Sequence, residues 1–304
     1  MKALLIMNPG SRAGRGKKLW PLWKAELRKH GIGFDCFQTE APGQAVEVVK
    51  NLQDYDTVVA VGGDGTINEV IDGLMQREHS DLQMGVLYSG TSPDFCRFHA
   101  IPLEVSRAVD VLASGKTTPV DIVRIRCRSA DGSERISHFA SSCNIGLGGC
   151  IARTSNRVRK VFGDTAGTGL AVLWSIFLLK PRNLKLTVDC QVIELQAVNN
   201  LGIIKNPFLA SGLRLDLRLQ PADGRLMLFA VYDKSRLSLL SMLPGFYSGR
   251  VAERSDVFVK QVTTVKVECA DPCAVEFDGD PRGFLPIEVK LIPQGLNLIG
   301  STND

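Results

Sequence analysis

A short apolar run that ends in glycine and aspartate is the part of this chain best suited to chemistry. Residues 57–61, Thr-Val-Val-Ala-Val, are typical of a buried strand, and residues 62–65, Gly-Gly-Asp-Gly, follow directly. Apolar side chains at helical spacing over 67–74 then predict a helix. A glycine loop in this position lets backbone amides approach a ligand, and the helix N-terminus adds partial positive charge. The loop is therefore suited to phosphate.

The carboxylate of Asp64 narrows the chemistry of this loop. A site that only holds phosphate gains nothing from a fixed negative charge beside it. A metal-bound nucleotide, or a hydroxyl that must lose its proton, does gain from one. The alternative is structural, with Asp64 capping a helix that begins near Thr66 in an ordinary strand–turn–helix connection. These residues alone leave both interpretations open.

The first part of the chain, residues 1–120, alternates between expected strands and helices, which predicts a parallel sheet covered on both faces. The expected strands are Ala3–Met7, Phe34–Gln38, Thr57–Val61 and Met84–Leu87, and the helices are Lys17–His30, Gln44–Leu52, the segment after Gly65 and Leu103–Ala113. In the first helix we expect Leu19, Leu22, Trp23 and Leu27 to face the core. Loops at the carboxyl ends of such strands build ligand sites, and 8–16, 39–43, 62–66 and 89–94 all fall there.

The remainder of the chain, residues 121–304, has a different sequence pattern. Short alternating apolar segments separated by turn residues predict an antiparallel β-sandwich. Two helices, Gly167–Leu179 and Arg236–Ser248, interrupt these strands. We therefore predict an α/β N-terminal domain with a parallel sheet over 1–120, and a β-rich C-terminal domain over 121–304.

The composition is that of an ordinary globular protein. The chain has 304 residues, 44% of them hydrophobic and 22% charged, so two domains are expected. A net charge of +4 does not favour nucleic acid as a partner. The eight cysteines lack the paired spacing of a metal site. No signal peptide is visible and no apolar run reaches the ~18–20 residues of a membrane-spanning helix, so we expect a cytoplasmic protein.

An ordered set of motifs resembles the lipid kinase family of diacylglycerol kinase catalytic domains, bacterial diacylglycerol kinase-like lipid kinases and sphingosine kinases. A lone Gly-Gly-Asp-Gly is shared with NAD kinases, but here other motifs accompany it over nearly the whole chain. They are Asn8-Pro9, Thr39-Glu40, 62–70, 90–95 (Gly-Thr-Ser-Pro-Asp-Phe), Asp121, 144–148 (Asn-Ile-Gly-Leu-Gly), Ser211-Gly212, 222–224 and 277–280 (Phe-Asp-Gly-Asp). The resemblance implies a NAD kinase/diacylglycerol kinase-like α/β domain followed by a β-sandwich domain.

The resemblance also implies ATP-dependent phosphorylation of a hydroxyl group on a lipid such as diacylglycerol. Amides and threonine hydroxyls of the loops can donate to phosphate oxygens, and Arg12 or Arg15 can neutralise their charge. Without the resemblance, a turn residue before Pro9 explains Asn8 as well as a ligand contact does, and a strand-end cap explains Thr39 better. The nucleotide contacts implied by position are Asn8, Pro9, Gly10, Ser11, Arg12, Thr39, Gly62, Gly63, Asp64, Gly65, Thr66, Ile67, Asn68 and Thr91.

Two carboxylates receive catalytic roles by this resemblance. Asp64 would hold the magnesium-bound nucleotide, directly or through water, and Asp280 would accept the proton of the acceptor hydroxyl. Family members usually carry Glu at the second position. Asp has a shorter reach, and misplacement by ~1 Å can lower a rate about 100-fold. The alternative is that Asp278-Gly279 is a two-residue hairpin turn with no catalytic neighbour.

The resemblance further implies a structural Mg²⁺ site formed by Asp223 with residues Gln220 and Arg225, which flank it. One carboxylate with carbonyl groups and water holds magnesium weakly, and an ordinary Asp-Gly turn explains the residues equally well. Pro93 is a second departure from the family pattern. It removes a backbone donor from the loop after the fourth strand, while Asp94 remains available.

The expected partners are a lipid substrate and, transiently, the inner membrane surface, with no nucleic acid; a homodimer is one compatible assembly. The membrane contact would use the basic residues Arg153, Arg157, Arg159 and Lys160 together with the apolar helix that follows. The alternative is that this helix belongs to a core. Two other functions compete with the lipid kinase: a NAD kinase-like phosphotransferase with a soluble acceptor, and a catalytically weakened homologue that binds nucleotide or lipid.

Overall fold

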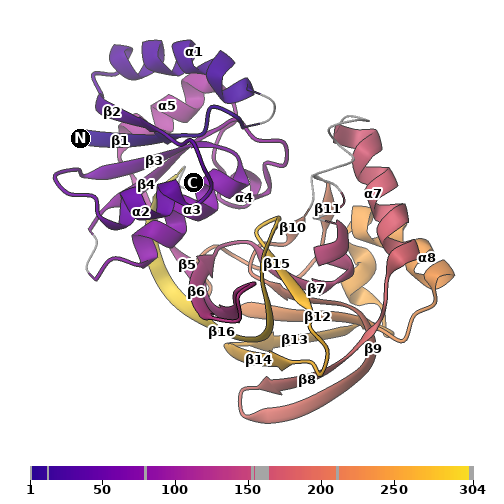
Figure 1. Ribbon diagram of the computed structural model, residues 1–304. Helices are drawn as coiled ribbons and strands as arrows, with labels where there is room; N and C mark the ends of the chain where they lie inside the picture. The colour runs from indigo at the N-terminus through magenta and orange to yellow at the C-terminus, as the bar shows by residue number, and fades with distance from the viewer. Residues whose placement is uncertain are drawn as a thin grey trace. The chain divides into compact units, whose positions relative to one another are not determined.

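The computed structural model divides the chain into two compact units, which are described separately (Figure 1). The first comprises residues up to Ile122, Pro221–Asp223 and residues from Ile292 onward, and the second comprises Val123–Gln220 and Gly224–Leu291. The described residues are 2–11, 14–78, 81–151, 154, 164–209 and 212–300. The first unit thus includes two segments from the later part of the chain, at 221–223 and after 292.

Four strands in the spatial order β2–β1–β3–β4 form the centre of the first unit. They are β1 (Lys2–Met7), β2 (Gly33–Gln38), β3 (Thr57–Gly62) and β4 (Gln83–Tyr88). β1 pairs in parallel with β2 and β3, β3 pairs in parallel with β4, and the end of β16 (Asp280–Ile299) adds a parallel neighbour to β4. β3 is buried along its whole length because both faces of the sheet are covered, whereas the edge strand β2 is largely exposed.

Helices cover both faces of this sheet (Figure 1). They are α1 (Arg15–Lys29), α2 (Gln44–Lys50), α3 (Asp64–Met75), α4 (Asp94–Phe98) and α5 (Val105–Ser114). α1 and α5 share one face, where Trp23 and Leu27 pack in a core cluster with Leu112 and with side chains of β1 and β3. α2 packs against α3, which contacts β3 and β1. One prediction for α1 was wrong: Leu22 is 55% exposed, because it lies outside the stripe that Trp23 and Leu27 define.

Antiparallel strands form the second unit, as predicted for this half of the chain. They are the part of β5 (Thr117–Arg128) after Ile122, β6 (Glu134–Phe139), β7 (Ser142–Gly146), β8 (Arg182–Val188), β9 (Gln191–Ile204), β10 (Phe208–Leu209), β11 (Leu213–Arg214), β12 (Leu226–Tyr232), β13 (Phe258–Val262), β14 (Thr264–Glu268), β15 (Ala274–Phe277) and the part of β16 before Ile292. β9 pairs with β7, β8 and β12, and β15 pairs with β7 and β16. Alternate side chains of these strands build one apolar core that includes Phe139 and Phe277.

Two longer helices belong to this second unit. They are α7 (Asp164–Leu178), whose side chains are described from residue 169 onward, and α8 (Arg236–Ser248), which is followed by the 3₁₀ turn η1 (Arg250–Glu253). α8 begins where expected because the Ser235 hydroxyl accepts the Ser238 N–H at 3.2 Å. In the described part of the chain, every helix is too short or too polar to cross a membrane.

Candidate active site

The glycine loop lies at the carboxyl end of β3, in the first unit. Gly62 ends the strand, Gly63 precedes α3, and the Thr66 and Ile67 N–H groups both donate to the Gly63 carbonyl at 3.0 Å. A Cβ atom at Gly62 would lie 2.3 Å from the Thr66 hydroxyl oxygen, and one at Gly63 would lie 3.0 Å from the Gly90 Cα. Both positions therefore require glycine because of close approach. The Thr66 amide could meet a phosphate only by exchanging its internal hydrogen bond.

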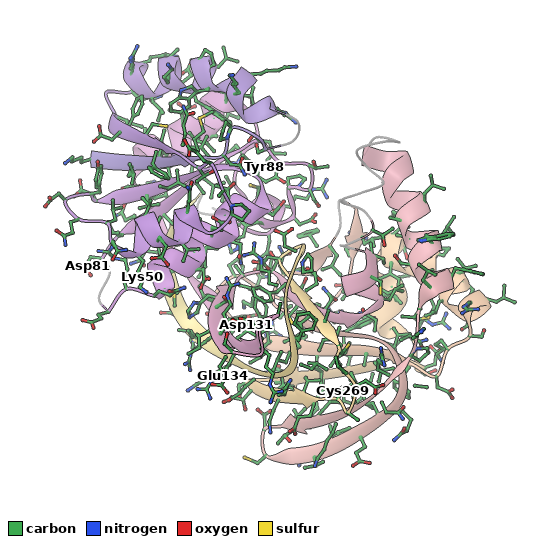
Figure 2. The ribbon with its side chains drawn as sticks, in the orientation of Figure 1. Lys50, Asp81, Tyr88, Asp131, Glu134 and Cys269 are labelled. Carbon is green, nitrogen blue, oxygen red and sulfur yellow. The ribbon has the colours of Figure 1, made fainter. Side chains whose placement is uncertain are left out.

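Asp64 is the first residue of α3, and its carboxylate faces a tyrosine. The Tyr88 hydroxyl donates to Asp64 Oδ2 at 2.8 Å, while the N-cap of the helix is Gly63, which makes no side-chain cap. Burial, followed by the negative charge of Asp64, raises the pKa of Tyr88 far above its ordinary value, so this hydroxyl remains a donor. Figure 2 labels Tyr88 in the first unit, where it ends β4. The capping alternative therefore does not describe the hydrogen bond that this carboxylate accepts.

A second carboxylate shares this environment. Asp94 begins α4 and is almost fully buried, and Asp94 Oδ2 accepts a hydrogen bond from the Ser92 hydroxyl at 2.5 Å. Burial and the charges of Asp64 and Asp94 together raise the pKa of the Cys96 thiol, which keeps this thiol neutral. The Asp64 and Asp94 carboxylates therefore both influence the Cys96 thiol, which places their charges in one region at the start of α3 and α4.

The remaining loops at this sheet edge are joined by short contacts. The Asn8 amide oxygen accepts the Gly10 N–H at 3.0 Å, so Asn8 forms the turn that was the alternative to a ligand contact. The Ser11 and Ser89 hydroxyl oxygens lie 2.5 Å apart, and the Ser89 N–H donates to the Gly62 carbonyl at 2.7 Å. Thr39 donates its N–H to the Met7 carbonyl at 2.9 Å. The structure thus brings the ends of β1, β3 and β4 together, with Thr39 attached beside them.

Not every predicted nucleotide contact has a side chain at this edge. Ile67 and Asn68 are buried within the unit, at 2% and 1% exposure, so their side chains point into packed structure. Thr91 and Pro9 are half-buried in the loops and Gly10 is exposed. Arg12 lies outside the described residues.

The second unit carries the other candidate carboxylate on a hairpin. Asp278 and Gly279 have φ values of +48° and +87° and connect β15 to β16, so the predicted alternative of a two-residue turn describes their backbone. The Asp278 carboxylate accepts the N–H groups of residues 140, 141 and 142 at 2.9–3.2 Å. Asp280 follows as the first residue of β16. Its side chain is 45% exposed and lies 3.3 Å from the Arg282 guanidinium.

Beneath this turn lies a buried acid that the sequence did not indicate. Glu276 Oε1 accepts the Gly279 N–H at 2.5 Å and Glu276 Oε2 accepts the Asn144 amide at 2.9 Å. Burial raises the pKa of Glu276 to about 7, against the lowering effect of these two hydrogen bonds and with smaller raising effects of Asp278 and Asp280. Glu276 therefore holds in place the turn that presents Asp280.

The predicted magnesium ligands near Asp223 have another partner. The Lys205 ammonium donates to the Gln220 carbonyl at 2.8 Å and to the Arg225 carbonyl at 3.3 Å. In the described part of the chain, no group of three or more His, Cys, Asp and Glu side chains is arranged to hold a metal ion.

Comparison with known proteins decides the family. Residues 2–125 match the model of the diacylglycerol kinase catalytic domain, and residues 141–300 match that of the YegS C-terminal NAD kinase beta sandwich-like domain. A diacylglycerol kinase from Staphylococcus epidermidis is 36% identical over 304 residues, covering 98% of this chain and 91% of the relative. The chain belongs to the diacylglycerol kinase family. It is a kinase, as the motif resemblance predicted, and its family implies ATP as phosphoryl donor.

Other proteins agree with this chain in sequence or in fold. A diacylglycerol kinase from Staphylococcus saprophyticus is 27% identical over 292 residues, which cover 94% of this chain and 90% of the relative. The crystal structure of a diacylglycerol kinase from Bacillus anthracis has the same fold, with a TM-score of 0.76, 20% identity and coverage of 99% and 97% of the two chains. Yeast NADH kinase shares the fold more distantly, with a TM-score of 0.56, 11% identity and coverage of 99% and 84%.

Three residues of this diacylglycerol kinase family member contact or adjoin the candidate carboxylates of their own unit and were not predicted to do so: Tyr88 and Asp94 in the first unit, and Glu276 in the second. Tyr88 and Glu276 lie on strands, where sequence pattern indicates only packing. Asp94 was noted only as an available carboxylate. The one sequence signal that could have assigned Asp94 to the site is its position just after a strand end, two residues beyond Ser92.

Proposed function

We propose that this kinase transfers the γ-phosphoryl group of Mg·ATP to the free hydroxyl of diacylglycerol. The observation that carries the proposal is the Asp64–Tyr88 hydrogen bond at the glycine loop of a chain from this family. The relatives named diacylglycerol kinase support this choice of acceptor, and they match almost the whole chain.

In this mechanism the first unit holds the nucleotide. Amides at the start of α3 bind phosphate oxygens, helped by the partial positive charge of the helix N-terminus. Carboxylate oxygens are the ligands that magnesium prefers, so Asp64 and Asp94 fit the Mg²⁺ of the nucleotide. When bound, that ion supplies neutralisation of the phosphate charge. Tyr88 fixes the direction of the Asp64 carboxylate and donates to it without competing for its charge.

The second unit supplies the acceptor side of the reaction. Asp280 Oδ accepts the proton of the lipid hydroxyl while the hydroxyl oxygen bonds to the γ-phosphorus and the bond from that phosphorus to ADP breaks. Arg282 orients the Asp280 carboxylate. The tight turn before Asp280 is held by Asp278 on one side and by Glu276 below. These hydrogen bonds fix the backbone that carries Asp280, so its carboxylate is presented from one position.

An acceptor series tests this proposal. With labelled ATP and Mg²⁺, we expect label in diacylglycerol carried by phosphatidylglycerol vesicles, and none in a sphingosine-like base, in phosphatidylglycerol itself or in NAD. Label in NAD alone would identify the soluble-acceptor phosphotransferase instead. Nucleotide binding without transfer to any acceptor would identify a binding protein. Both results overturn the proposal.

The same proposal includes a surface for the bilayer that carries the acceptor. One side of α7 packs into the second unit through Ala171, Val172 and Ile176, but its opposite side is also apolar and remains exposed. Trp174 and Phe177 are 56% and 61% exposed with stacked rings 6.3 Å apart. The α7–α8 apolar surface consists of the exposed residues Leu170, Leu173, Trp174, Phe177, Leu178 and Leu237.

A lipid bilayer suits this surface better than water does. Aromatic and leucine side chains gain by insertion at the depth of the headgroups, and Trp is favoured there. The Arg236 guanidinium lies 5.2 Å from the Phe177 ring, residues 169–182 contain no acidic side chain, and Lys180 follows the helix. These charges favour an anionic surface. The basic residues predicted for this contact, at 153, 157, 159 and 160, lie outside the described residues.

Replacing Trp174 and Phe177 together with Ser should lower binding to phosphatidylglycerol vesicles at least about tenfold, because burial of each aromatic ring contributes ~1.5–3 kcal/mol. Co-sedimentation measures the binding. Turnover of a short-chain, water-dispersed diacylglycerol should remain. The matched control is Val192→Ser, which removes an equally exposed apolar side chain from β9. Equal binding by the double variant and the control would show that this surface does not touch the bilayer.

A further inference from the structure

A lysine with almost no exposed surface lies at the end of β9. Lys205 is 1% exposed, and its ammonium donates to the carbonyl oxygens of Gln220 and Arg225, on both sides of the loop that contains Asp223. A charged lysine is rarely buried unless its donors are satisfied, because removing an ammonium group from water is strongly unfavourable. The carbonyl groups of this loop therefore point at a cation that belongs to the chain.

Those two carbonyls are the ones that a structural magnesium ion would need. Magnesium demands oxygen ligands at about 2.0–2.1 Å in near-octahedral geometry. Such an ion at the Gln220 oxygen would lie beside the Lys205 ammonium, which is 2.8 Å from the same atom, and the two positive charges would repel each other. The residues present therefore do not fit the metal that the family resemblance implies.

We propose that the Lys205 ammonium is the permanent cation of the 220–225 loop, so that this kinase needs no structural metal there. The ammonium offers three donors, and the loop offers carbonyl acceptors in the place of a coordination shell. Arg225 reinforces the loop independently, since its guanidinium donates to the Arg218 carbonyl at 2.7 Å. The inference concerns the loop alone and does not depend on the acceptor of the reaction.

The same lysine connects the loop to the turn that carries Asp280. The N–H groups of Lys205 and Asn206 both donate to the Ser141 carbonyl at 2.9 Å. The Ser141 N–H in turn donates to the Asp278 carboxylate at 2.9 Å. Loss of the ammonium would therefore loosen both the 220–225 loop and the segment that supports the candidate catalytic turn.

Thermal unfolding of the full chain without nucleotide tests this inference. The Tm of the unmodified protein should agree within about 1 °C in EDTA and in 10 mM MgCl₂, since no metal site is present to bind the folded state preferentially. Lys205→Met, which keeps length and removes the charge, should lower the Tm by about 5–10 °C, because the Gln220 and Arg225 carbonyl groups lose the ammonium that donates to them. The control is Lys266→Met, on the exposed face of β14, which should have the same Tm as the unmodified protein.

Lys205→Ala extends the test by opening space at the same carbonyl groups. We expect its Tm to rise by several degrees when MgCl₂ is added, as a metal takes the vacated position. A magnesium-dependent rise in the unmodified protein would overturn the inference, and so would a Lys205→Met variant as stable as the control. If the Lys205 variants do not fold, the unmodified protein can be titrated with Mn²⁺ and the bound ion measured by electron paramagnetic resonance. Tight Mn²⁺ binding without nucleotide would contradict the proposal. Absence of such binding would support it.

Discussion

Asp64→Asn should lower kcat for phosphoryl transfer about 100- to 1,000-fold, which is the range seen when one electrostatic contact to the transition state is removed. The substitution keeps the shape of the side chain, and the amide oxygen can still accept the Tyr88 hydroxyl. What it removes is the negative charge that the proposed mechanism assigns to the magnesium-bound nucleotide. Initial rates with labelled ATP and vesicle-borne diacylglycerol measure the loss, and the Tm should change little.

Tyr88→Phe is the matched control for this prediction. It removes the donor and leaves the charge of Asp64, so we expect a loss of about tenfold or less, as for one hydrogen bond to a charged group. A smaller effect for Asp64→Asn than for Tyr88→Phe would mean that the pair is structural and that its charge has no part in transfer.

The free energy of unfolding should fall by about 2.5 kcal/mol between pH 5 and pH 8 through Glu276 alone. The pKa of Glu276 is raised to about 7 in the folded chain from an ordinary value of 4.5, a difference that corresponds to about 3 kcal/mol. Between these two values the folded state keeps a proton that the unfolded state has released, so stability decreases as pH rises. The contribution is fully present below the unfolded pKa and is lost as pH passes the folded one.

Glu276→Gln should remove this slope, because an amide does not titrate and can still accept one of the two hydrogen bonds. Urea unfolding at intervals across this pH range measures the difference between the two proteins. The control is Glu268→Gln, since Lys266 lowers the pKa of the exposed Glu268 and this group stays ionised above pH 5. Parallel stability curves for the Glu276 variant and the unmodified protein would show that the buried acid does not titrate in this range.

Local pattern predicted the strands and the longer helices within residues 1–120 well, because each of their signals is contained in a short stretch of chain. The continuous apolar strand at 57–61 and the glycines after it determine both the end of β3 and the start of α3. α8 begins and ends at the predicted residues, where Ser235 caps it and Gly249 has φ of +85°.

Long-range pairing explains what the pattern did not predict. β16 extends over twenty residues, yet Pro281, Gly283, Pro286 and Pro293 interrupt it and made only 287–291 recognisable as a strand. β7 was not distinguished from the segment before it, because Ser142 follows β6 closely and only pairing with β9 and β15 defines the new strand.

The candidate site likewise divides into residues that a local motif predicts and residues that only long-range contacts reveal. The glycine loop and Asp280 follow from motif resemblance, but the partners that adjust them are distant in sequence. Glu276 lies 132 positions from Asn144, and alternation alone would place a strand glutamate at the surface. Lys205 likewise reads as an exposed residue at a strand end until its carbonyl partners are seen.

Calorimetric titration of Mg·ATP into the folded chain tests the central claim most directly, which is that the glycine loop and the Asp64 carboxylate bind the magnesium-bound nucleotide. We expect one Mg·ATP per chain, and affinity at least about tenfold weaker in Asp64→Asn, since loss of a charged contact corresponds to about 1.5–3 kcal/mol. No binding heat from well-folded protein, at any temperature at which the chain is stable, would contradict it, and so would equal affinity in the variant.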